Sequence, residues 1–133
     1  MSVVLRGPST AIEVAFPADT ANMAIARSVA AAVAARADLT VDQIEDVRLA
    51  IDEAAAYLIA HASPDARVRG RLWTDEHTFH ASLSCATDST TAPEPEPFSW
   101  TVLTALVGDI DRELVDGELV MHWALTRDHS VPA

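Results

Sequence analysis

The sequence predicts an α+β fold, a two-layer sandwich with three helices on one face of a mostly antiparallel sheet of about five strands. Two observations predict this fold class. The elements follow one another as strand, helix, helix, hairpin, loop, helix and hairpin, and each carries one apolar face. One layer of helices packed on one sheet buries all of these faces. A chain of 133 residues suffices for one hydrophobic core but not for two, so residues 1–133 form a single domain.

The first strand and the first helix are indicated by a change in the period of the apolar residues. Between residues 11 and 16, large apolar residues at every second position alternate with alanine or glutamate, and Pro17 ends this strand. An alanine-rich helix is then expected from Asp19, as its N-cap, to Arg36. A spacing of four residues predicts its buried stripe, which consists of Ile25, Val29 and Val33.

A second helix begins with a capping signal. Thr40 and Gln43 form a T-x-x-Q capping box, in which two free backbone N–H groups are satisfied reciprocally. Apolar residues at spacings of three and four continue to about Ala62, and the helix stops before Pro64. The predicted apolar face consists of Ile44, Val47, Ile51, Ala55 and Leu58.

The next two runs predict a hairpin followed by a flexible loop. Residues 67–73 and 77–85 have the composition and alternation of strands, with a turn near residues 75–76. Serine, threonine, proline and glutamate then dominate residues 88–97. Because proline excludes helix, this segment is expected to be extended and mobile.

A third helix and a second hairpin complete the predicted domain. The helix is expected over residues 99–110, and strands over 112–115 and 118–126 flank a type I′ turn at residues 116–117. Residues 128–133 are expected to form a disordered tail. The buried stripe of this helix is predicted to consist of Val102, Leu103, Leu106 and Ile110.

Composition restricts the functional classes. No stretch approaches the roughly 20 apolar residues of a membrane span, no export signal is recognisable, and the single Cys85 fits a reducing cytoplasm. The five histidines lack metal-binding spacing, so no metal site is predicted. The net charge of −11, with nine basic residues that are all arginine, argues against direct nucleic-acid binding. The acidic surface suits a basic protein partner, or serves only solubility.

One stretch carries a family resemblance. Residues 46–62 resemble the N-box helix of GHKL ATPases, in particular of the RsbW and SpoIIAB type of anti-sigma factor and serine kinase. Residues 16–18, Arg27 and residues 99–106 fall where that family has comparable elements, and the resemblance covers roughly residues 11–126. The run that begins Phe98-Ser99-Trp100 is most like an actinobacterial subgroup of the UsfX type. The resemblance implies a Bergerat, or GHKL-like, fold.

The resemblance also implies a degenerate nucleotide pocket. In the family's N-box, E-x-x-x-N, the glutamate is the general base and the asparagine binds the magnesium of Mg-ATP. Glu53 matches the base, but Tyr57 occupies the asparagine position, and a phenol is a poor Mg²⁺ ligand. Alternatively, Glu53 and Tyr57 are only a charged and an aromatic residue at the edge of an amphipathic helix.

The remaining nucleotide-binding boxes of the family are missing. Residues 84–89 stand where the family has D-x-G-x-G, and no glycine occurs between Gly70 and Gly108. Without glycines the backbone cannot easily approach an anion, and the carboxylates of Glu94 and Glu96 would repel phosphates. We therefore expect no cofactor and no catalytic residue, with Glu53 as a vestigial base.

The resemblance implies a regulatory function through protein partners. The expected activity is sequestration of an alternative sigma factor, with release when a STAS-type anti-anti-sigma factor competes for the same surface, and the chain is expected to form a homodimer. The corresponding surface includes Arg27 and Asn22, although a lone arginine on a helix can also be merely solvated. Two alternatives stay open: an ATP-dependent serine kinase with Glu53 as base, and a scaffold domain with an unrelated partner.

Overall fold

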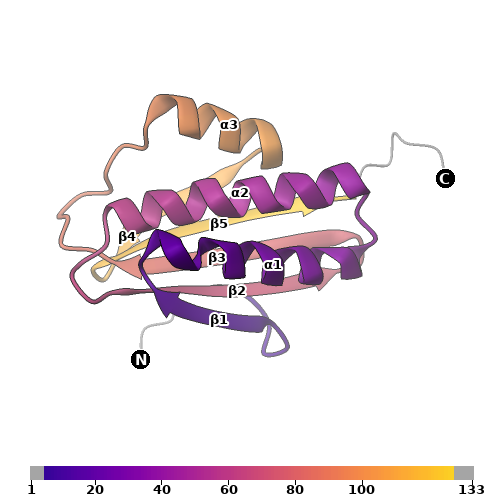
Figure 1. Cartoon of the computed structure of the whole chain (residues 1–133), viewed down its shortest axis with the longest axis horizontal. Coiled ribbons are helices and arrows are strands. Elements are labelled where there is room, and N and C mark those ends of the chain that lie inside the picture. The colour runs from indigo at the N-terminus through magenta and orange to yellow at the C-terminus, as the bar shows by residue number, and fades with distance from the viewer. Residues whose placement is uncertain (1–4, 128–133) are drawn as a thin grey trace.

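The helices and the sheet form two layers. The computed structural model describes residues 5–127, in which three α-helices lie on one face of a five-stranded sheet (Figure 1). The strand order is β1-β2-β3-β5-β4, and all neighbouring strands are antiparallel. The predicted fold class is therefore confirmed. The strands are β1 (Ile12–Pro17), β2 (Arg67–Asp75), β3 (Thr78–Ala86), β4 (Ile110–Val115) and β5 (Glu118–Thr126).

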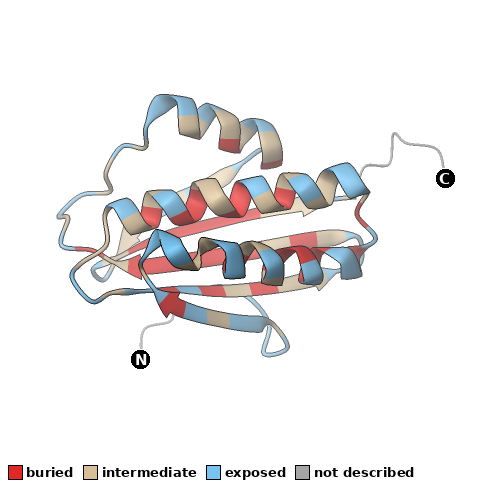
Figure 2. Ribbon diagram, in the orientation of Figure 1, coloured by how far each residue is buried: buried red, intermediate tan, exposed pale blue. Residues whose placement is uncertain are grey.

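The hydrophobic core lies between the helices and the three inner strands, β2, β3 and β5. Figure 2 shows buried residues on the sheet-facing sides of the helices and along these strands. Phe79 and Leu83 on β3 and Met121 on β5 are almost completely buried among residues of the helices. The helices are α1 (Met23–Ala34), α2 (Val41–Ala60) and α3 (Pro97–Val107), and short 3₁₀ turns precede and follow α1 at Thr20–Asn22 and Ala35–Ala37.

The first helix has a different buried face from the predicted one. Ile25 is 61% exposed and Val29 only partly buried, so Val33 alone of the expected stripe is buried. Alanine lets α1 approach α2 closely, and the side chains at this contact are therefore small. The helical run spans residues 20–37 as expected, but both ends are 3₁₀, and Asp19 caps the first 3₁₀ turn rather than α1. The buried alanines of α1 are Ala26, Ala30, Ala31 and Ala34.

The second helix follows the prediction closely. The Thr40 hydroxyl accepts a hydrogen bond from the Gln43 N–H at 3.1 Å, and the Gln43 side chain accepts one from the Thr40 N–H at 3.3 Å. The capping box is therefore confirmed. The helix ends at Ala60, two residues before the expected end, and Ile44 is partly rather than fully buried. The other predicted core residues of α2, which are Val47, Ile51, Ala55 and Leu58, are buried.

The third helix begins and ends earlier than predicted. It starts at Pro97 and ends at Val107, because Gly108 has a φ of 78° and leaves helical geometry. Ile110 does not extend its buried stripe but begins β4, two residues before the expected strand. The predicted turn between β4 and β5 is present, with positive φ at Asp116 and Gly117. Residues 128–133, predicted as a tail, lie outside the described residues.

A short segment crosses the face of the sheet that carries no helix. We call residues 5–8 the N-terminal strap. The N–H of Arg6 donates a hydrogen bond to the Ser82 hydroxyl at 3.0 Å, and the Arg71 guanidinium donates to the carbonyl of Pro8. Gly7 has a φ of 123° and lies so close to the Trp73 ring that a Cβ there would be 2.7 Å from it. Hydrogen bonds near both ends of the strap therefore attach it to β2 and β3.

Candidate functional site

Two predicted partner-binding residues lie at the start of the helical layer. Arg27 on α1 forms an ion pair with Asp52 on α2, with Nη1 2.7 Å from one carboxylate oxygen and 2.9 Å from the other. The Asn22 side chain donates a hydrogen bond to the Pro17 carbonyl at 3.0 Å. Arg27 is thus not merely solvated but joins two helices, and Asn22 joins the end of β1 to the start of α1. The structure does not bring the two side chains together through any hydrogen bond.

Glu53 and Tyr57, which are predicted to belong to a degenerate nucleotide pocket, lie four residues apart on α2. Glu53 is partly buried, and no ion pair within residues 5–127 engages its carboxylate. Tyr57 has a different environment, because its hydroxyl donates a hydrogen bond to the carbonyl of Pro93 at 2.6 Å. The tyrosine therefore reaches the segment between β3 and α3, which is the segment predicted to be a flexible loop.

Arg112 on β4 completes this contact. Its Nη1 donates to the Pro93 carbonyl at 2.7 Å and to the Tyr57 hydroxyl at 3.3 Å. The guanidinium carbon also lies 5.9 Å from the centre of the Tyr57 ring and 5.6 Å from that of Trp100 on α3, within cation–π range. We call Tyr57, Pro93, Trp100 and Arg112 the Tyr57 cluster. It joins α2, the loop, α3 and β4 at one point.

Sequence reasoning missed Arg112, although a signal was present. In β4 the residues Ile110, Arg112 and Leu114 share one face, and Ile110 and Leu114 pack against the core. An arginine between two core-facing residues has to find a partner for its charge on the inner side of the sheet. Here the Pro93 carbonyl, the two aromatic rings and, at 3.8 Å, the carboxylate of Glu94 serve that purpose.

The start of α3 is occupied by a side chain of the loop itself. The Glu96 carboxylate accepts hydrogen bonds from the backbone N–H groups of Phe98 and Ser99 at 3.2 and 3.0 Å. These bonds lower the pKa of Glu96. A helix N-terminus is a position where a phosphate can bind, and here a carboxylate of the same chain takes its place. The sequence predicts repulsion of phosphates by Glu96, but it does not predict this cap.

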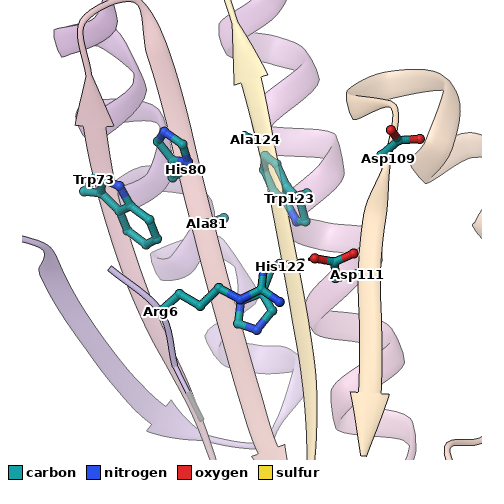
Figure 3. Close-up of a pocket in the computed structure, with 9 residues that line it drawn as sticks. All are labelled: Arg6, Trp73, His80, Ala81, Asp109, Asp111, His122, Trp123 and Ala124. Carbon is teal, nitrogen blue, oxygen red and sulfur yellow. Dashed lines mark hydrogen bonds and ion pairs between the residues drawn. The ribbon is translucent and has the colours of Figure 1, made fainter. Parts of the chain in front are cut away.

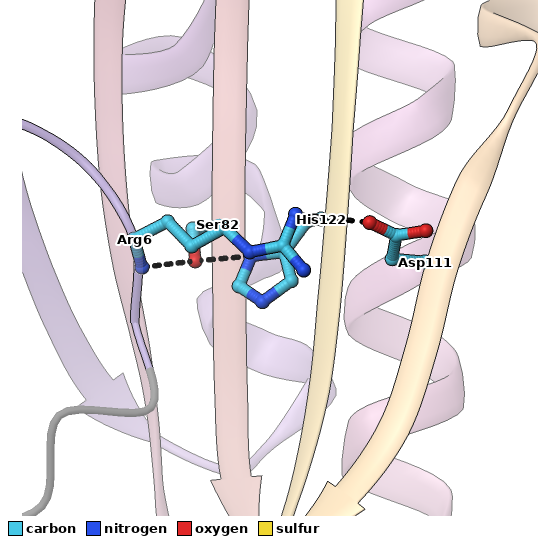
Figure 4. Close-up of polar contacts among 4 residues, drawn as sticks. All are labelled: Arg6, Ser82, Asp111 and His122. Atoms are coloured by element: carbon cyan, nitrogen blue, oxygen red, sulfur yellow. Dashed lines mark hydrogen bonds and ion pairs between the residues drawn. The ribbon is translucent and has the colours of Figure 1, made fainter.

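A second polar network lies on the helix-free face. The Ser82 hydroxyl is 2.6 Å from Nδ1 of His122, and Arg6 of the N-terminal strap extends across His122 to form an ion pair with Asp111 at 2.9 Å (Figure 4). His122 is 6% exposed, and burial, followed by the charge of Arg6, lowers its pKa. No local sequence pattern indicates this network, because it depends on the pairing of β5 with β3 on one side and with β4 on the other.

Other reactive groups are poorly suited to chemistry. Cys85 is buried, and burial together with the charge of Glu118 raises its pKa to about 11, so its thiol stays protonated near neutral pH. Among residues 5–127, no group of three or more histidine, cysteine, aspartate or glutamate side chains could hold a metal ion. Within the same residues, no helix is long and apolar enough to cross a membrane.

Comparison with known proteins places the chain among known folds. Residues 16–99 match the model of the histidine kinase-like ATPase domain. The chain is 39% identical over 102 residues to the anti-sigma-F factor RsbW of two Mycobacterium tuberculosis strains, a match that covers 75% of this chain and 60% of each relative. A crystal structure of RsbU and RsbW domains from M. tuberculosis superimposes with a TM-score of 0.66 at 16% identity, covering 91% of this chain and 33% of that one. The matched region contains α1, α2 and two members of the Tyr57 cluster, Tyr57 and Pro93, and the chain thus belongs to the histidine kinase-like ATPase domain family.

Proposed function

We propose that this chain is an RsbW-type anti-sigma factor that sequesters an alternative sigma factor without binding ATP. Release follows when a STAS-type anti-anti-sigma factor occupies the same surface. The observation that carries the proposal is the Tyr57 cluster, because the side chain four residues after Glu53 is bonded to Pro93 and Arg112 of the same chain. Partner exchange of this kind requires only different affinities for two proteins and no chemistry.

Three features of the site support a function without nucleotide. The Tyr57 hydroxyl already donates to Pro93, and a phenol is in any case a poor ligand for Mg²⁺. The N-terminal N–H groups of α3 bind the carboxylate of Glu96. Finally, the loop that would have to open for a nucleotide is attached to β4 through Arg112. Each feature independently disfavours a bound triphosphate.

The outer side of α1 and α2 supports the proposed partner surface. The Arg27–Asp52 ion pair joins these helices, and Ile25 and Leu49, on the same two helices, are 61% and 51% exposed. Exposed large apolar residues are typical of protein interfaces. The net charge of −11 favours a basic partner. We further propose a cytoplasmic homodimer, in line with the single Cys85 and with the family resemblance, and membership of the UsfX-type subgroup, which the run that begins Phe98-Ser99-Trp100 resembles.

Calorimetry and partner capture test the proposal together. Titration of the chain with Mg-ATP is expected to give no binding heat, whereas capture of a sigma factor from the native cytoplasm is expected to succeed. Arg27→Glu is expected to weaken that capture by about tenfold or more, because it reverses one charge of the Arg27–Asp52 pair. Arg36→Glu, at an exposed position just after α1, is the matched control and should leave capture unchanged. Equal capture by both variants would contradict the placement of the surface.

A kinase remains the second candidate because of Glu53. Glu53 is partly buried, and no ion pair within the described chain engages its carboxylate, so this group is available to accept a proton. Binding of Mg-ATP with micromolar affinity, and phosphate transfer that is lost in Glu53→Gln, would favour the kinase over the nucleotide-free regulator.

A further inference from the structure

The helix-free face of the sheet carries a pocket next to the N-terminal strap. Its volume is about 230 Å³, and it lies on the side of the sheet opposite to α2 and the Tyr57 cluster (Figure 3). The strand register explains the hollow. Trp73 on β2 pairs with His80 on β3, and His80 pairs with Ala124 on β5, so a methyl group follows two large rings in one row across the sheet. The pocket is open at Ala124, where the side chain in this row is smallest.

One wall of the pocket is aromatic. The rings of Trp73 and His80 are stacked, with their centres 4.9 Å apart and an angle of 2° between their planes. Gly7 of the N-terminal strap lies against the indole and holds it in place. Burial lowers the pKa of His80, so its imidazole is neutral near pH 7. This wall therefore offers uncharged π surface.

The opposite wall is acidic. Asp111 forms an ion pair with Arg6, but Asp109 is exposed, and no ion pair within residues 5–127 engages it. Two carboxylates therefore face a single guanidinium among the lining residues. In addition, the whole chain carries a net charge of −11. The electrostatic potential of the pocket thus favours a cation and opposes phosphate or carboxylate ligands.

From these walls we infer that the pocket binds a guanidinium group, as carried by an arginine side chain or an arginine-like small molecule. A planar cation suits both walls, because its face packs on aromatic rings and its N–H groups pair with a carboxylate. The width of the pocket agrees with such a ligand. Because β5 lies between β3 and β4, His80 and Asp109 are two strand spacings apart, or about 10 Å. The pocket already accommodates one such group, since the Arg6 guanidinium extends across His122 to Asp111.

A nuclear magnetic resonance titration of the full chain tests this inference. The probe is N-acetyl-L-arginine amide, and N-acetyl-L-citrulline amide is the control, because its urea group has nearly the same shape and no charge. Saturable shifts are expected at the Trp73 indole N–H and at the backbone amides of His80 and Ala124. Citrulline is expected to bind at least about tenfold more weakly, which corresponds to the loss of one charge-assisted contact. Equal binding of the two probes, or no saturable shift with either, would overturn the inference.

Variants then locate the contact. Asp109→Asn is expected to weaken binding of the arginine probe by at least about fivefold. Glu76→Gln removes an exposed carboxylate at the turn between β2 and β3, outside the pocket, and should leave binding unchanged. Free agmatine and an acetylated Gly-Arg-Gly amide distinguish the two sources of the ligand. Tighter binding of agmatine indicates a small molecule, tighter binding of the peptide indicates a protein partner, and failure of both contradicts the site.

Discussion

Arg112 shows how much of the proposed site depends on one side chain. Its guanidinium bonds to the loop and contacts rings on α2 and α3. Arg112→Gln should therefore release the loop, lower the free energy of unfolding by about 1–3 kcal/mol and speed amide exchange over residues 87–96. Glu94→Gln is the control. Because the Glu94 side chain is 89% exposed and 3.8 Å from Arg112, its loss should change stability by less than about 0.5 kcal/mol. Unchanged exchange in Arg112→Gln would show that the cluster does not hold the loop.

Gly7 is required by both backbone geometry and contact. Its φ is 123°, and a Cβ would lie 2.7 Å from the Trp73 ring. Gly7→Ala should therefore detach the N-terminal strap and raise amide exchange at Arg6, whose N–H donates to the Ser82 hydroxyl, with a cost of about 2 kcal/mol or more. Gly117 has a φ of 79° but nothing within 4 Å of its Cβ position. Gly117→Ala thus measures backbone strain alone, and an equal effect of both variants would exclude the contact with Trp73 as the cause.

Individual site residues were predictable only where one element determines them. Glu53 and Tyr57 are predicted from the resemblance to the family's N-box, and their spacing of four residues within one helix places them on one side of α2. Arg112 and His122 were not found, because their partners come from other strands or from the loop. The packing of the whole sheet determines which strands are neighbours, and no local sequence pattern specifies it.

At the scale of elements, α1 shows where periodicity fails. The spacing of Ile25, Val29 and Val33 predicted an apolar stripe, yet alanines fill the buried side. An alanine-rich helix has small residues on every side, so the largest side chains do not mark the core. The side that faces α2 is chosen by how closely the helices can approach each other.

This arrangement predicts opposite effects for two substitutions on α1. Ala30 is fully buried, so Ala30→Leu should destabilise the domain by about 1–3 kcal/mol through overpacking. Ile25→Ala should change the free energy of unfolding by less than about 0.5 kcal/mol, because the side chain is 61% exposed. Urea denaturation of both variants measures the two effects. A larger loss in Ile25→Ala would favour the stripe predicted from the sequence.

At the scale of the whole molecule, the layers were predictable although the details of contact were not. Alternating and helical periods identified every strand and helix of the described chain, and the only economical packing of their apolar faces is a two-layer sandwich. The N-terminal strap escaped prediction because residues 5–8 have no period of their own. Their position depends on Ser82, Trp73 and Arg71 of the finished sheet.

The buried His122 makes global stability depend on pH. Burial and Arg6 lower its pKa, while Asp111 and Glu113 on β4 act in the opposite direction. The unfolded chain takes up a proton at this imidazole near pH 6.5, before the folded chain does, so stability should fall as the pH drops below about 6.5 and stay unaffected above about 7. His122→Gln should be less stable at pH 7.5 but lose less stability between pH 7.5 and 5.5. Melting temperatures of both proteins across this range check the difference, and parallel curves would contradict it.

The place of the N-terminal strap has a consequence for the order of folding during synthesis. Arg6 leaves the ribosome before its partners Ser82 and Asp111, which follow 76 and 105 residues later. The strap must therefore wait until both partners have been translated before it can dock. Contacts so distant in sequence form slowly. The helix-free face of the sheet is thus covered by the strap only after β3 and β4 have been made.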